Sequence, residues 1–174
     1  DLSSGIGDLT GVSDEATAGI TLQGRGGRDT LEGGAGDDVL KGGKGDDTLE
    51  GGAGDDILTG QKGADTFVQD FSKPGSDTIT DFNPGQDTIN FTGLNDLENI
   101  SVDEVDGGTL ISAGEGNTLL LEGVTPDQLG VGNVTIDGEA LSPGTSGSDL
   151  SSVIGDLTEV SDEASADITL RGRG

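Results

Sequence analysis

Five residue types are missing from this chain of 174 residues: cysteine, histidine, tryptophan, tyrosine and methionine. Without cysteine there is no disulfide and no thiolate ligand, and without histidine no imidazole can bind a metal or act as a general base. An HExxH zinc site and a Ser-His-Asp triad are therefore excluded. Acid pairs of the glycosidase type remain possible by residue type, but four phenylalanines are the only aromatic residues. We expect that the chain is not an enzyme.

Basic residues are also scarce, with 8 lysines and arginines against 34 acids and a net charge of -26. Such a chain repels the phosphates of nucleic acid and anionic lipid, so we expect neither as a partner. No apolar run is long enough to insert into a membrane, and the first fifteen residues lack the basic region and apolar core of a signal peptide. The charge itself fits a disordered tail, a nucleic-acid mimic or a set of carboxylates that bind cations.

Glycine is abundant instead, with 34 residues, and residues 24–68 divide into five nonapeptides: GRGGRDTLE, GGAGDDVLK, GGKGDDTLE, GGAGDDILT and GQKGADTFV. Position 4 is always glycine, position 6 is always aspartate and position 8 is always large and apolar. A flexible linker has no reason to keep an apolar residue at this interval. We therefore interpret the segment as a structural repeat in which six-residue turns alternate with three-residue strands, each with one inward side chain.

The composition of each turn predicts its ligand. Glycine adopts positive φ freely, so the turns can curl until several backbone carbonyls converge, and the aspartate adds a charge. Oxygen is the only ligand chemistry available, and calcium accepts six to eight oxygens in a loose geometry, whereas magnesium gives up its waters reluctantly. Calcium is the expected cofactor. The acids at position 5 share their slot with arginine and alanine, so we predict that they are solvated: Asp37, Asp46 and Asp55.

These nonapeptides resemble the RTX (repeats-in-toxin) motif GGxGxDxUx, a calcium-binding parallel β-helix repeat. The resemblance implies an all-β parallel β-roll in which two nonapeptides make one turn of eighteen residues. Loops 24–29, 42–47 and 60–65 would then stack on one edge, and loops 33–38 and 51–56 on the other. It also implies three complete calcium sites: Arg25, Gly27 and Asp29 with Gly42, Lys44 and Asp47; Gly34, Gly36 and Asp38 with Gly51, Ala53 and Asp56; Gly43, Gly45 and Asp47 with Gly60, Lys62 and Asp65.

Residues 69–148 are predicted to continue and cap the roll with further strands, at 99–105, 108–113 and 117–124, and a short helical turn at 125–130. Three acids in this region are either half-sites for calcium or turn and edge residues, and the sequence leaves both open: Asp77, Asp81 and Asp87. At a larger scale, residues 149–174 repeat residues 1–26 with five differences. We therefore predict a linker at 1–23, the roll at 24–68, its continuation at 69–148, and the start of a next tandem module at 149–174.

The resemblance and the long-range repeat together predict a calcium-dependent structural module of a large secreted or cell-surface bacterial protein, such as an adhesin. Its partners would be calcium and the neighbouring modules of the same chain. By the same resemblance, the parent would leave the cell by type I secretion and fold outside on binding calcium. The alternative is a calcium-responsive carboxyl-terminal folding and export domain of a secreted toxin or hydrolase. An ice-binding solenoid is a weaker alternative, because the threonines that recur every eighteen residues lack paired companions: Thr30, Thr48 and Thr66.

Overall fold

The structure is a computed structural model, and it describes residues 9–10, 18–94, 100–113 and 116–140. The predicted next-module segment at 149–174 lies outside the described residues, as does most of the predicted linker at 1–23. Two seven-stranded sheets make up the fold. The first contains, in spatial order, β1 (Leu9–Thr10), β3 (Thr30–Ala35), β5 (Thr48–Ala53), β7 (Thr66–Asp70), β9 (Thr88–Thr92), β13 (Val134–Ile136) and β14 (Glu139–Ala140). The second contains β10 (Ile100–Val105), β11 (Gly108–Ala113), β12 (Asn117–Glu122), β8 (Gly75–Ile79), β6 (Ile57–Lys62), β4 (Val39–Lys44) and β2 (Thr21–Gln23).

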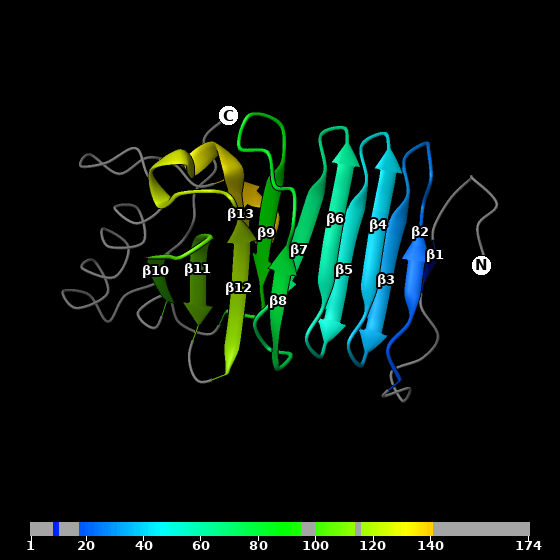
Figure 1. Cartoon of the computed structure of the whole chain (residues 1–174), viewed down its shortest axis with the longest axis horizontal. Coiled ribbons are helices and arrows are strands. Elements are labelled where there is room, and N and C mark those ends of the chain that lie inside the picture. The colour runs from blue at the N-terminus through cyan, green and yellow to red at the C-terminus, as the bar shows by residue number, and fades with distance from the viewer. Residues whose placement is uncertain (1–8, 11–17, 95–99, 114–115, 141–174) are drawn as a thin grey trace.

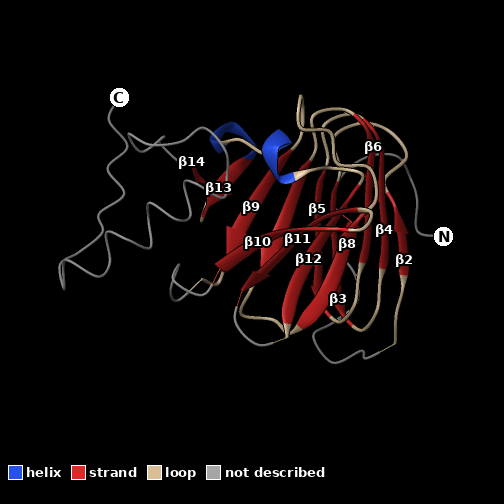
Figure 2. Cartoon of the chain, turned by 60° about the vertical axis from the view of Figure 1, so that its left-hand side comes forward, coloured by secondary structure: helices blue, strands red, loops and turns tan. Residues whose placement is uncertain are grey.

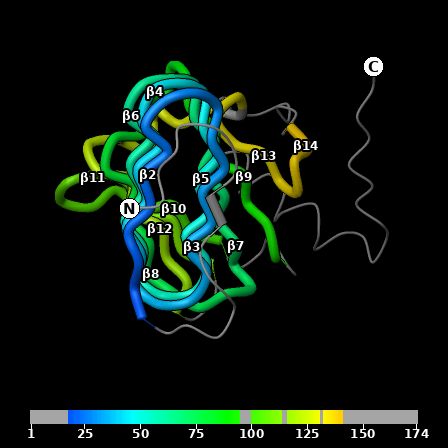
Figure 3. The backbone as a smooth tube through the Cα atoms, turned by 90° about the vertical axis from the view of Figure 1, so that its right-hand side faces the viewer, coloured from blue at the N-terminus to red at the C-terminus, as the bar shows by residue number. Residues whose placement is uncertain are grey.

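From β2 to β9, successive strands alternate between the two sheets, and each pairs in parallel with the strand two places along the chain. The chain therefore winds as a flattened coil, with the loops stacked at its two edges (Figure 1). Seen along the coil axis, the turns lie over one another around a narrow interior (Figure 3). The predicted all-β parallel β-roll is confirmed.

The apolar residue at position 8 of each nonapeptide fills the interior. In the first sheet, Leu31 pairs with Leu49 and Leu49 with Phe67, and all three side chains are buried. The second sheet supplies the facing column, in which Leu40 pairs with Leu58. Each nonapeptide buries only one such large side chain, whereas all nine of its residues lose conformational freedom on folding. The apolar column alone therefore does not hold the roll together.

The strands are longer than the predicted triplets, because β3, β4, β5 and β6 each contain six residues. The first three positions of the following nonapeptide join the ladder, as in the pairing of Gly34 with Gly52 and of Ala35 with Ala53. Stacked turns satisfy the N–H and C=O groups of these glycines, which would otherwise need water. In each nonapeptide, the turn is therefore limited to positions 4 to 6.

Beyond the nonapeptides, both sheets are extended. The strands predicted at 99–105, 108–113 and 117–124 are confirmed as β10, β11 and β12, of which β12 pairs in parallel with β8. The predicted helical turn contains η1 (Pro126–Gln128), followed by η2 (Val131–Asn133) and by β13, which pairs in parallel with β9. Figure 2 shows these short helices in blue near β13 and β14. Among the described residues, no helix is long and apolar enough to cross a membrane.

Candidate metal sites

The loops at the two edges of the roll bring the position-6 aspartates into two columns. All five are 1 to 2% exposed: Asp29, Asp38, Asp47, Asp56 and Asp65. Carboxylates are rarely buried so fully unless they are paired or bind a metal. The repeated burial of an acid in every nonapeptide therefore requires partners that compensate for the lost water.

In four of these carboxylates, those of Asp38, Asp47, Asp56 and Asp65, one oxygen has such a partner in the turn before it. The backbone N–H of Asp29 donates to Asp47 Oδ1 at 2.8 Å, and that of Asp38 donates to Asp56 Oδ1 at the same distance. Asp47 in turn donates to Asp65 Oδ1 at 2.9 Å. Each aspartate is thus fixed at the start of its strand, directly below the aspartate eighteen residues earlier.

The second oxygen is different. Within the described residues, Oδ2 is buried and lacks a hydrogen-bond partner at four of these aspartates: Asp29, Asp38, Asp47 and Asp56. An unpartnered buried carboxylate oxygen costs several kcal/mol, so a repeated set of them indicates a cation.

The position-1 glycines show where the cation would lie. A Cβ built on Gly33 would be 2.3 Å from Asp38 Oδ2 and 2.4 Å from the carbonyl oxygen of Gly51. The same point beside Gly24 is 2.5 Å from Asp29 Oδ2 and 2.6 Å from the Gly42 carbonyl oxygen. Beside Gly24 and Gly33, then, a carboxylate oxygen and a carbonyl of the next turn face the same small space, so both oxygens can be ligands of one cation.

The other carbonyls that the resemblance implies lie along the same stack. The position-3 oxygens of Lys44, Ala53 and Lys62 accept the N–H groups of position-4 glycines one turn earlier, at 2.8 Å. The Arg25 carbonyl accepts the Lys44 N–H at 3.0 Å. A carbonyl oxygen has two lone pairs, so each of these retains one for a cation.

The structure therefore stacks the loops of all three implied sets at the spacing of one turn. Two of the loops lack the second glycine of the motif. Arg25 and Gln61 occupy that position and adopt the same left-handed conformation as the glycines elsewhere, with φ of 75° and 74°. The loop shape is preserved at these positions at a cost of about 1 to 2 kcal/mol each.

The donor set is mostly backbone. The described residues contain no group of three or more acidic, histidine or cysteine side chains arranged for a metal. Two carboxylates with several carbonyls form a hard, all-oxygen site, which suits calcium better than a transition metal.

Burial also changes the acidity of these groups. Loss of water raises the pKa of Asp56 to about 7, with the nearby charges of Asp77 and Asp38 adding to the effect. Burial, followed by the charge of Asp87, raises the pKa of Asp65 to about 6. The pKa values of Asp38 and Asp47 are raised for the same first reason, loss of water. A cation between the turns would offset both the burial and the repulsion, so ion binding competes with protonation.

The position-5 acids are exposed, as predicted, but they are not free of contacts. Asp37 Oδ1 accepts the N–H of Asp55 at 3.0 Å, and Asp46 Oδ1 accepts the N–H of Ala64 at 3.0 Å. Asp46 also lies 3.5 Å from the Arg28 guanidinium. These carboxylates bond to the turn that follows, whereas the position-6 carboxylates bond to the turn that precedes.

Two further units continue the stack, as one of the two interpretations of Asp77 and Asp87 predicted. Asp77 Oδ1 accepts the N–H of Asp56, and Asp87 Oδ1 accepts that of Asp65, both at 3.0 Å. The segments SKPGSDTIT (72–80) and FNPGQDTIN (82–90) thus act as nonapeptides with glycine, aspartate and isoleucine in the required positions. The signal was present as a shared Pro-Gly-x-Asp-Thr-Ile, but the offsets to the preceding turn are 21 and 22 residues rather than 18.

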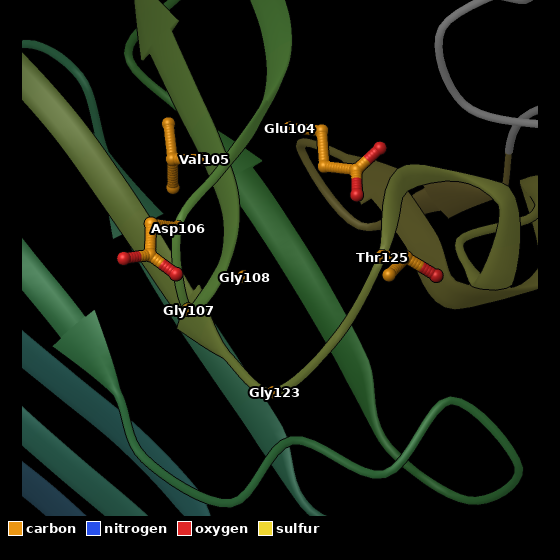
Figure 4. A pocket seen from close by; sticks show the side chains of 7 residues that line it. All are labelled: Glu104, Val105, Asp106, Gly107, Gly108, Gly123 and Thr125. Carbon is orange, nitrogen blue, oxygen red and sulfur yellow. The ribbon is translucent and has the colours of Figure 1, made fainter.

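A surface hollow lies elsewhere, beside the turn between β10 and β11 (Figure 4). The carboxylates of Glu104 and Asp106 point to separate places, and Thr125 lies on the side of Glu104, across from Asp106. Neither acid is buried. This hollow therefore lacks the convergent groups of a catalytic site.

Comparison with known proteins identifies the repeat segment. Residues 17–49 and 32–67 match the sequence profile of the RTX calcium-binding nonapeptide repeat. This segment is an array of RTX calcium-binding repeats. Among solved structures, the RTX segment and its continuation are similar to two repeat subunits of the Azotobacter vinelandii mannuronan C5-epimerase. The AlgE6R3 subunit is 29% identical, with a TM-score of 0.48 over 79% of this chain and 93% of that one. For the AlgE6R2 subunit the values are 26%, 0.46, 74% and 97%. No curated protein matches the chain.

Proposed function

We propose that this chain is a calcium-dependent structural module of a large secreted or cell-surface bacterial protein, with an extending role as in an adhesin. The observation that supports it is the set of buried aspartate oxygens without a partner, of which those of Asp29, Asp38 and Asp47 share a small space with a carbonyl of the next turn. Three ions would lie between stacked loops, at the pairs Asp29–Asp47, Asp38–Asp56 and Asp47–Asp65. The backbone carbonyls of the two loops would complete each site.

Calcium would act here as part of the fold. Its charge would offset the repulsion of stacked carboxylates, and its bonds would join turns whose apolar column is too small to hold them. In the cell, where free calcium is low, the chain would stay unfolded and suited to type I secretion. Outside, binding would drive folding by mass action.

The extending role rests on a separate observation. Residues 149–174 repeat residues 1–26 with 21 of 26 positions identical, which indicates an array of similar modules. An array of whole modules builds length, whereas a single folding and export domain at the end of a toxin or hydrolase needs no second copy. The repeat therefore favours the structural module over that alternative.

Circular dichroism of the full chain during a calcium titration tests the calcium dependence. We expect a disordered spectrum in excess chelator and a β spectrum, with protease resistance of residues 18–94, once calcium is added. Magnesium at the same concentration is the matched control, because it screens charge equally but gives up its waters reluctantly. A β spectrum that survives chelation, or equal folding in magnesium, would contradict the proposal.

A further inference from the structure

The stack at one edge of the roll continues past the recognised repeats. Loop 51–56 is followed, one turn later, by residues 72–77, which lie outside the matched segment. The Gly54 N–H donates to the Pro74 carbonyl at 3.1 Å, as the Gly36 N–H donates to Ala53 at 2.8 Å one turn earlier. A Cβ on Gly75 would meet the Gly54 carbonyl oxygen at 2.0 Å, so the two backbones are in close contact. Residues 72–77 thus stand where a further calcium loop would stand.

The two carboxylates at this position, Asp56 and Asp77, differ in their hydrogen-bond partners. Asp56 is 1% exposed and Asp77 is 5% exposed. Asp77 Oδ1 accepts the Asp56 N–H, but Asp56 Oδ2 is buried without a partner. The charge of Asp77 adds to the burial that raises the pKa of Asp56. Two neighbouring buried carboxylates repel each other unless a cation or a proton offsets their charge.

A side-chain amide lies beside this pair of carboxylates. Gln69 on β7 is 4% exposed, and its side-chain amide lies 2.8 Å from Asp77 Oδ2, with Nε2 as the donor. The amide carries an oxygen as well as a nitrogen, and rotation about its terminal bond exchanges the two. With a cation between the carboxylates, Oε1 would face the ion. The nearest lysine is engaged elsewhere, because Lys73 Nζ lies 2.7 Å from Glu50 and 3.7 Å from Asp70.

The other edge of the roll ends differently. Asp87 Oδ2 accepts the Asn83 N–H at 2.8 Å, and the two oxygens of Asp81 accept the N–H groups of Gly60 and Gln61. These donors are backbone groups, which cannot be exchanged for an oxygen. Among the described residues, the buried unpartnered oxygens do not include one at Asp65. Backbone donors therefore occupy Asp81 and Asp87 at this edge, while Asp56 Oδ2 at the other edge is left without a partner.

We propose that Asp56, Asp77 and Gln69 form a fourth calcium site, completed by carbonyls of loop 51–56. It rests on the proposed function, since it requires that the preceding turns fold with calcium. This site would differ from the three sites of the repeat in one ligand. The side-chain amide of Gln69 would replace backbone carbonyls that a glycine-rich loop supplies.

Calcium counting on the full chain tests the site. After dialysis at fixed free calcium, elemental analysis should give four ions for the wild-type chain and three for Asp77→Asn. Gln69→Leu should also lower the count or raise the calcium needed to fill the last site, and Gln69→Glu should restore it. Asp87→Asn, on the closed edge, is the matched control and should keep four.

The outcomes separate this proposal from the three-site proposal. Three ions in both the wild-type chain and Asp77→Asn would overturn the fourth site and leave the other three. An equal count of four in both would also overturn it, because the fourth ion would then lie elsewhere. No tightly bound calcium in any chain would overturn both proposals. If Asp77→Asn does not fold, the wild-type count together with the pair Gln69→Leu and Gln69→Glu decides.

Discussion

Replacement of Gly33 by alanine should remove one calcium ion through a single methyl group. The glycine opens the loop 33–38, and its α-carbon faces the space between Asp38 Oδ2 and the Gly51 carbonyl. Its φ lies outside the left-handed region, so alanine adds no backbone strain and acts only through contact. The substitution therefore tests the position of the ion rather than the flexibility of the loop.

The size of the effect follows from the distances. The new Cβ would lie 2.3 Å from one oxygen and 2.4 Å from the other, while ordinary contact begins near 3.4 Å. Each oxygen must therefore move by about 1 Å, which is several times the tolerance of a calcium–oxygen bond. A lost site at a hundredfold excess of calcium over its Kd removes about 2.7 kcal/mol of stabilisation.

The assay combines the calcium count with the calcium midpoint of folding by circular dichroism. Gly33→Ala should bind one ion fewer than the wild-type chain and require more calcium to fold. Gly26→Ala is the matched control, because the nearest atom to its new Cβ, the Lys44 carbonyl oxygen, is 3.6 Å away and its φ is also outside the left-handed region. Equal counts and equal midpoints for the two variants would refute the placement of the ion beside Gly33.

Three further predictions address the columns. Asp47→Asn should lower the calcium count by two and Asp38→Asn by one, because within the repeats only Asp47 lies between two stacked aspartates. Asp46→Asn, at an exposed position, is the control and should leave the count unchanged. Equal losses for the three variants in elemental analysis would indicate diffuse binding. The pKa of Asp56, raised to about 7 when folded, means that the calcium-free fold binds a proton that the unfolded chain lacks between about pH 4 and 7. Stability of the calcium-free fold should therefore rise as pH falls through that window, and less calcium should be needed for folding at pH 5.5 than at pH 7.5; a folding midpoint that is higher at pH 5.5 would count against this. Gln61→Gly should relieve the left-handed conformation and stabilise the calcium-bound chain by about 0.5 to 1 kcal/mol, and a lower melting temperature in saturating calcium would contradict it.

The repeat determined most of this fold in advance, because one residue in nine carries the packing and one carries the charge. Leu40 and Leu58 could be placed inside and Asp38 and Asp56 at the loop ends from periodicity alone. The stacking of three loops at one edge and two at the other was implied by the RTX resemblance.

The units at 72–80 and 82–90 could not be placed in the same way. A parallel ladder requires only that strands align, so Thr66 can pair with Thr88 although the connection between them is longer than one regular turn. Extra residues are accommodated where the chain leaves the ladder, for example in the turn in which Asp70 accepts the N–H of Ser72. A fixed repeat period in the sequence reveals the stacked turns only where every turn has the same number of residues. The role proposed for Gln69 is harder still to predict from the sequence, because it depends on a contact between its side chain and that of Asp77, eight residues later and across a turn.

The ladder hydrogen bonds of the roll run along its long axis, while the chain runs around it. A pull along that axis therefore loads the bonds between turns end to end, and every ion that joins two loops carries tension together with the ladder. Turns would separate one at a time, each releasing eighteen residues, or about 60 Å of extended chain. In a protein under flow or shear, the calcium concentration outside the cell would then set the force at which each module begins to lengthen.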